Sequence, residues 1–198
     1  MASRLVSSHM DAFATLDLPY RLTLPESDLQ QAYAAQSRVA HPDHGGSDAQ
    51  ASQVNAAFEI LRSPEKRLRH LLELAAPDEA TAWRTVPLDD SMMALFAKLG
   101  QALDSSNKFL EKKTRAQSAL ARALLTGEEM EHRESLEDLG AAIARHMTSL
   151  EAQFPDLDEA LHADPAPDTW KQVATTQARL AYLTKWQTQI RERLLQLM

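Results

Sequence analysis

The chain of 198 residues contains no cysteine. This absence excludes disulfides, thiolate nucleophiles and every zinc or iron-sulphur site that needs a thiolate ligand, so only His, Asp and Glu remain as metal ligands. Glycine is also scarce, with five residues in the whole chain. Many positions are filled instead by Ala, Leu, Gln, Glu and Arg, which are helix formers. The composition therefore predicts an all-α fold.

Basic residues are fewer than acidic residues in this chain. The sequence has 21 Lys and Arg against 28 Asp and Glu, which gives a formal net charge of -7. A chain of this sign has no general attraction to nucleic acid or to an anionic membrane surface. No apolar run approaches the roughly 20 residues of a membrane span, and the N-terminus lacks the apolar stretch of a secretory signal. We therefore predict a cytoplasmic protein that binds neither nucleic acid nor membrane.

Apolar residues recur at helical spacing in four segments of the N-terminal part of the chain. Thr23 and Glu26 have the spacing of a capping box for the second segment, and Ser47 or Asp48 can cap the third. The expected helices cover residues 11–17, 27–40, 48–62 and the segment that begins with Ser63 and Pro64. The two long ones are expected to pack against each other through Leu29, Tyr33, Val54 and Phe58.

The C-terminal part shows three longer apolar stripes. Residues 76–87 contain two prolines and acidic side chains and predict a linker or elbow. The stripes beyond it predict an antiparallel three-helix bundle over residues 88–198, with the first stripe continuing to Leu124. Interruptions are expected at Ser105–Asn107, at a turn over Thr126–Glu129 and in a loop over Asp156–Asp168. Residues 1–10 are polar and aperiodic, resemble a tag, and are excluded from the fold.

The segment from His41 to Ser47 cannot continue a helix. Pro42 lacks the amide hydrogen and biases the residues before it away from helical backbone angles, and two glycines follow. The sequence therefore predicts a loop that carries His41, Pro42 and Asp43 at the tip of two antiparallel helices. Because proline stiffens the backbone, this corner would present an imidazole and a carboxylate to a partner without a folding step.

The order of these features resembles a J-domain, the module by which co-chaperones act on DnaK-type chaperones. The resemblance is carried by Leu29 and Tyr33, by His41-Pro42-Asp43, and by the run from Val54 to Arg67. It covers residues 11–75. The segments Arg67–Leu74 and Asp168–Trp186 are similar to HscB-type co-chaperones of iron-sulphur cluster biogenesis, so that the likeness extends over nearly the whole chain.

The resemblance implies an L-shaped protein in which a J-domain is joined by an elbow to a C-terminal helical bundle. It also implies two partners, a DnaK-type chaperone ATPase and an IscU-type scaffold protein. The implied chaperone-binding residues are Tyr33, Arg38, His41, Pro42 and Asp43, and the implied scaffold-binding residues are Met92, Met93, Phe96 and Tyr182. The chemistry then lies in the chaperone, whose conformation the co-chaperone shifts. We expect no enzymatic activity, no catalytic residue, no cofactor and no resident metal.

Two features depart from the resembled family. J-domains usually carry several basic residues on the second helix, whereas here Arg38 stands among Asp28, Gln30, Gln31, Gln36 and Ser37, which predicts weak electrostatic steering. The family's scaffold-binding patch also contains acidic residues. Here Ala94, Ala97 and Gly100 occupy the corresponding positions.

Two alternatives remain open. The bundle could serve another client or a dimerisation role, because the acidic cargo residues are absent. A metal-dependent hydrolase built on His41, Asp43 and His44 is the reading from a different functional class, although three ligands crowded in one loop without a second cluster make a poor metal site. Met92 and Phe96 have a purely structural reading as well, as residues that fill the bundle core.

Overall fold

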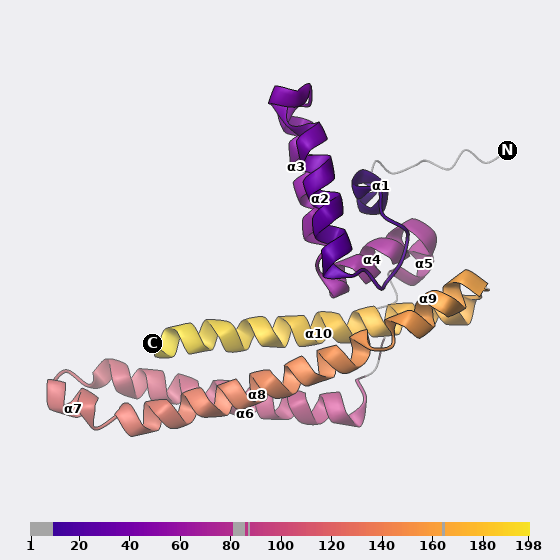
Figure 1. Ribbon diagram of the computed structural model, residues 1–198. Helices are drawn as coiled ribbons and strands as arrows, with labels where there is room; N and C mark the ends of the chain where they lie inside the picture. The colour runs from indigo at the N-terminus through magenta and orange to yellow at the C-terminus, as the bar shows by residue number, and fades with distance from the viewer. Residues whose placement is uncertain (1–9, 81–85, 87, 164) are drawn as a thin grey trace. The chain divides into compact units, whose positions relative to one another are not determined.

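The computed structural model shows an all-α chain, as the composition predicts (Figure 1). It describes residues 10–80, 86, 88–163 and 165–198, and these contain no strand. The expected tag, apart from Met10, and residues 81–85 and 87 of the expected linker lie outside the described residues. In the described part, no helix combines the length and the hydrophobicity that a membrane span requires.

The helices form two compact units. The first unit consists of Met1–Arg84 and Gln153–Ala178, and the second consists of Thr85–Ala152 and Arg179–Met198. The residues between 153 and 178 thus group with the N-terminal part of the chain. The J-domain limits of 11–75 and the bundle limits of 88–198 stay predictions.

The first unit is built around a helical hairpin. Helices α2 and α3 lie side by side, with a short 3-10 turn, η1, at their tip, and α1 packs against α3 (Figure 1). The core is apolar, with Phe13, Leu16, Leu29, Leu61, Leu68 and Leu72 fully buried. The elements are α1 (Ala12–Leu16), α2 (Glu26–Ala40), η1 (Pro42–His44), α3 (Asp48–Leu61), α4 (Pro64–Ala75), α5 (Pro77–Ala80) and α9 (Phe154–Ala163), together with the start of α10 (Pro167–Leu197).

Serine caps begin α3 and α4 as expected. The Ser47 hydroxyl accepts the amide of the third residue along, at 3.3 Å, and Ser63 does the same at 3.4 Å. The expected capping box of α2 is wrong, because Pro25 precedes this helix and no side chain caps it. Instead, the carboxylate of Asp158 in α9 accepts the amides of Leu22 and Thr23 at 2.7 and 2.8 Å. A contact between distant parts of the chain therefore fixes the segment before α2, while no side chain caps the helix itself.

Helix α9 occupies most of the segment that was expected to be a loop. Prolines indicated a break there, yet Pro155 lies in the first turn of α9 and Pro167 begins α10. A proline is tolerated in the first turn because its missing amide hydrogen would have no partner there in any case. Phe154 and Leu157 of α9 are buried in the first unit, and this burial explains why a helix forms.

The second unit is a bundle of α6 (Asp90–Arg115), α8 (Thr126–Glu151) and the C-terminal part of α10, with the short α7 (Ala119–Ala123) between α6 and α8. Lys113 near the end of α6 pairs with Glu129 near the start of α8 at 2.7 Å, so these two helices are antiparallel. The Lys113 ammonium also donates to the carbonyl of Leu197 at 3.2 Å, near the end of α10. Helix α10 therefore runs parallel to α6.

Three details of the bundle differ from the sequence prediction. Helix α6 is continuous through Ser106, because the serine hydroxyl donates to the Leu103 carbonyl within the helix, at 3.0 Å. Residues 126–129 form the first turn of α8 rather than a turn that precedes and caps it. Leu120 and Leu124 do not continue the core stripe, since both lie exposed on α7.

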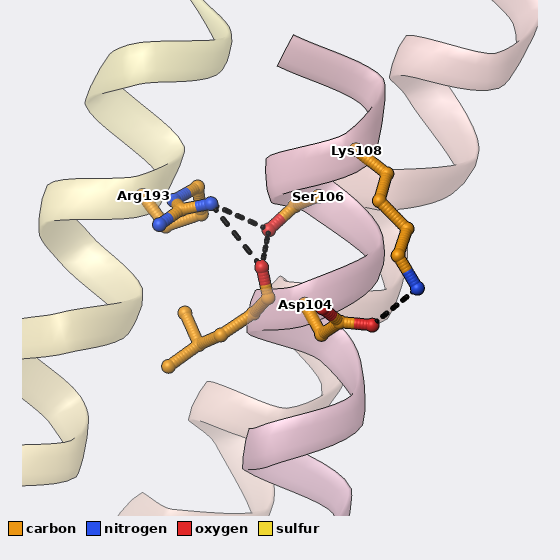
Figure 2. A network of polar contacts seen from close by, with 5 residues as sticks. Asp104, Ser106, Lys108 and Arg193 are labelled. Carbon is orange, nitrogen blue, oxygen red and sulfur yellow. Dashed lines mark hydrogen bonds and ion pairs between the residues drawn. The ribbon is translucent and has the colours of Figure 1, made fainter. Parts of the chain in front are cut away.

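A polar contact fixes the register of α6 against α10 (Figure 2). One nitrogen of the Arg193 guanidinium donates to the Ser106 hydroxyl at 3.1 Å, to the Leu103 carbonyl at 3.3 Å and to Asn107 at 2.5 Å. Ser106 is fully buried. Figure 2 shows Arg193 reaching from α10 to α6. Because a buried polar group is costly to leave unpaired, a shift of one helix along the other would be penalised here.

Phe58 is less buried than the sequence suggested. Its ring lies 4.3 Å from that of Tyr33, but it is only half-buried, whereas Leu61 one turn later is fully buried. We predict that Leu61→Ala lowers the free energy of unfolding by about 2 to 5 kcal/mol, and that Phe58→Ala lowers it by less than the roughly 3 kcal/mol minimum of a fully buried Phe. Urea unfolding of both variants measures this. A greater loss for Phe58→Ala than for Leu61→Ala would contradict the packing of the hairpin.

Candidate functional site

The tip of the hairpin reverses the chain within a few residues. His41 has extended backbone angles, and a single 3-10 turn from Pro42 follows. The Gly45 amide donates to the Pro42 carbonyl and the Gly46 amide to the His41 carbonyl, both at 3.1 Å. The backbone of the tripeptide is therefore closed by hydrogen bonds on both sides of the proline.

Two glycines are required for this closure. Gly45 has a φ of 88°, in the left-handed region that residues with a side chain rarely adopt. Gly46 lies so close to the chain before the tripeptide that a Cβ atom there would overlap the Ala40 carbonyl. The loop just before α3 thus lies in direct backbone contact with the end of α2, and the turn between them has little room to rearrange.

His41 and Asp43 contact each other although both are exposed. The Asp43 amide donates to His41 Nδ1 at 3.2 Å, and the Asp43 carboxylate lies 3.6 Å from the same nitrogen. A neutral ring that accepts at Nδ1 carries its proton on Nε2. The exposed fractions of the two side chains are 57% and 84%. The turn therefore places an imidazole and a carboxylate side by side at the surface.

The two other residues expected at this site have different surroundings. Arg38 is exposed on α2, three residues before His41. Tyr33 is half-buried, and its hydroxyl donates to the Asn55 side chain of α3 at 2.8 Å. Tyr33 therefore braces the hairpin through its ring and its hydroxyl. Sequence reasoning missed Asn55, because no local pattern pairs residues on different helices.

The residues expected to bind a scaffold protein divide into a buried one and an exposed group. Met92 has an exposed fraction of 2% and fills the core of the second unit, so it cannot contact a partner directly. Met93 and Phe96 have exposed fractions of 51% and 52%. Phe96 of α6 and half-buried Tyr182 of α10 lie against the buried Trp186, with ring centroids 5.8 and 6.2 Å from it. We call Met93, Phe96 and Tyr182 the bundle patch.

A charged contact supports the bundle patch at the start of α6. The Asp89 carboxylate caps α6 by accepting the Met92 amide at 3.0 Å, and it pairs with Arg179 of α10 at 3.3 Å. The Ser91 hydroxyl donates to the same carboxylate at 2.6 Å. This hydrogen bond, followed by that from the Met92 amide, lowers the pKa of Asp89, and Arg179 adds to the effect. Asp89 thereby joins the two helices that carry the patch.

The metal-site alternative gains no support from the structure. Among the side chains that the structure describes, which do not include that of His44, no three His, Asp or Glu residues come close enough to hold an ion.

Comparison with known proteins identifies the family, although no family model matches the chain. The co-chaperone protein HscB homolog of Azoarcus sp. (strain BH72) is 27% identical over 195 residues, covering 93% of this chain and 94% of that protein. The HscB homolog of Burkholderia multivorans (strain ATCC 17616 / 249) is 30% identical over 168 residues, covering 80% of this chain and 74% of the relative. The chain belongs to the HscB co-chaperone family. Among solved structures, the chaperone HscB from Vibrio cholerae matches with a TM-score of 0.56 at 19% identity, covering 96% of this chain and all of that one.

The free energy of unfolding of this HscB-family protein should fall in acid, partly because the Asp89 carboxylate becomes protonated. Because its pKa is lower in the folded state, its ionised form stabilises the fold above its unfolded pKa, and this contribution disappears as the pH falls through the folded pKa. We predict that Asp89→Asn, which keeps a capping side chain, is less stable than the wild type at about pH 7, and that the difference closes toward about pH 3. Urea unfolding at several pH values measures it. A difference that is independent of pH would contradict the assignment.

Proposed function

We propose that this HscB-family protein is a co-chaperone that stimulates ATP hydrolysis by a DnaK-type chaperone and delivers an IscU-type iron-sulphur scaffold protein to it. The observation that carries the proposal is the hydrogen-bonded His41-Pro42-Asp43 turn at the tip of the α2–α3 hairpin. Family membership and the bundle patch support it.

The proposed action on the chaperone is allosteric. A ligand shifts a conformational equilibrium only by as much as its affinities for the two conformations differ. The preformed turn supplies such a difference if the His41 ring and the Asp43 carboxylate find partners in one conformation of the chaperone alone. Because the turn is ordered before binding, little of the binding free energy is lost in ordering it. The protein itself performs no catalysis, and ATP is hydrolysed in the chaperone.

The proposed scaffold-binding surface is the bundle patch. Exposed methionine and aromatic side chains adapt to apolar partner surfaces, and Trp186 beneath them holds the Phe96 and Tyr182 rings. The neighbouring exposed residues Ala94 and Ala97 add no charge. The cargo contact of this chain would therefore be apolar, and it would respond little to salt.

The role of the turn is tested by replacing its histidine. We predict that His41→Gln abolishes most of the stimulation of steady-state ATP hydrolysis by a purified DnaK-type chaperone, because glutamine cannot reproduce the ring that accepts the Asp43 amide. The matched control is His162→Gln, an exposed histidine of α9 in the same unit, which should stimulate like the wild type. Full stimulation by His41→Gln would refute the proposed mechanism.

The role of the bundle patch is tested by calorimetric titration with a folded IscU-type scaffold protein. We predict that Met93→Ala and Tyr182→Ala each weaken binding by about tenfold, as expected for truncation of a central apolar contact. Leu124→Ala is the control, because this leucine is at least as exposed but lies on α7, away from the patch. If the wild type gives no heat with the scaffold, the protein serves another client. Equal weakening by the control would show that the patch has no special role.

A further inference from the structure

One end of the second unit carries exposed apolar side chains that its core does not use. At this end α6 stops, α7 follows and α8 begins, and the last turn of α10 lies beside the end of α6 (Figure 1). The exposed residues are Leu120, Leu124, Met130 and Leu195, with exposed fractions of 72%, 76%, 63% and 63%. We call these four residues the bundle end. Large apolar side chains that gather on a surface mark a place that another molecule covers.

Helix α7 is held in place although its leucines face outward. The Arg122 guanidinium donates to the Ala116 carbonyl at the end of α6, at 3.0 Å. Leu125, directly after α7, is buried in the core of the second unit. Leu120 and Leu124 are four residues apart and therefore share one side of the helix. The protein thus presents a fixed pair of leucines to its surroundings.

Charges of opposite sign flank these leucines in the sequence. Residues 112–124 contain four basic side chains and no acidic one, which gives a net charge of +4. Residues 126–134 contain four acidic side chains and one basic one, which gives a net charge of -3 with histidine neutral. Two ion pairs between α6 and α8, one of them Lys113 with Glu129, use part of these charges inside the chain.

Other charges at this end are left for a partner. Arg122 on α7 and Glu131 and Glu134 on α8 are all exposed. Within the part of the chain that the structure describes, none of these three side chains belongs to an ion pair. The bundle end therefore has an apolar centre, an unpaired cation on α7 and unpaired anions on α8.

A surface with one basic and one acidic flank is complementary to itself. Two copies that meet about a two-fold axis use the same surface twice, so that the basic flank of one copy lies against the acidic flank of the other. A partner whose surface carries charges of one sign would place like charges together on one of the two flanks. The charge pattern therefore favours a second copy of this chain as the occupant.

We propose that the bundle end is a homodimer contact, in which Leu120 and Leu124 of two copies meet and Arg122 of each copy faces Glu131 of the other. The contact leaves the bundle patch uncovered. Met93 and Arg115 lie on the same 26-residue helix, about 33 Å apart at 1.5 Å per residue. The inference does not depend on the proposed function. It gives a dimer with two tripeptide turns and two bundle patches.

Sedimentation equilibrium of the full chain at several concentrations tests the proposal. We expect a reversible monomer–dimer equilibrium with a dissociation constant on the order of 10 μM, because the bundle end is smaller than a standard interface. Leu124→Lys should raise this constant by at least about tenfold, because it desolvates two like charges at the centre of the contact. Val39→Lys is the matched control, at a similarly exposed apolar residue of α2 in the first unit, and should leave the constant unchanged.

Exchange of the flanking charges tests the two-fold arrangement. Arg122→Glu and Glu131→Arg should each raise the dissociation constant by about tenfold, because each reversed side chain then faces a like charge. The double variant restores opposite charges across the axis, so its constant should return to within about threefold of the wild-type value. Failure of the double variant to restore the dimer would overturn the two-fold pairing.

The remaining outcomes are equally decisive. A wild type that stays monomeric at all concentrations, or a dimer that Leu124→Lys leaves intact, would overturn the inference. Species that grow beyond the dimer with concentration would show head-to-tail association and overturn it as well. If the wild type is monomeric and Leu124→Lys weakens its binding to an IscU-type scaffold, the leucines contact cargo instead. Stimulation of the chaperone is measured separately, so none of these results decides the proposed function.

Discussion

The presentation of the tripeptide depends on one steric constraint, the backbone contact between Gly46 and the end of α2. The chain must leave α2, turn at Pro42 and enter α3 within seven residues, from His41 to Ser47. It does so because residue 46 has no Cβ atom and approaches the Ala40 carbonyl directly. The exposed ends of His41 and Asp43 are then positioned by backbone hydrogen bonds rather than by packing. A turn closed by backbone hydrogen bonds can thus carry two exposed polar side chains.

The second unit also holds exposed side chains in a fixed arrangement, but it does so through contacts between helices. Its patch is formed by side chains from two helices that are far apart in sequence, so their register decides whether Phe96 and Tyr182 share the Trp186 ring. Asp89 with Arg179 at one end, and Arg193 with the Leu103 carbonyl and the Ser106 hydroxyl further along, hold that register. Polar contacts are directional, so they add to the specificity of the apolar packing. The charged residues therefore position an apolar surface that contains no charge itself.

The sequence predicted features whose causes are local. Ser47 and Ser63 cap helices because each bonds an amide three residues away, and Pro42 breaks a helix through its own ring. The prediction failed where contacts between residues far apart in the sequence decide the local structure. Thr23 does not cap α2, because the helix begins at Glu26 directly after Pro25, and Asp158 accepts the Thr23 amide. The prolines around α9 did not prevent a helix whose apolar residues are buried. At the candidate site, the His41-Pro42-Asp43 motif could be identified directly from the amino-acid sequence. The burial of Met92, and the bracing of Tyr33 by Asn55, required knowledge of which helices pack together.

The bond between Asp158 and the amide of Leu22 joins residues 136 positions apart. During synthesis, the segment before α2 cannot gain this acceptor until the chain has been translated beyond α8. The hairpin packs against α1 and α4, which lie near it in the sequence. It can therefore form early, whereas closure of its unit waits for residues made much later. A ribosome that stalls between these two points would therefore hold a nascent protein in which the His41-Pro42-Asp43 turn precedes the completion of its own core.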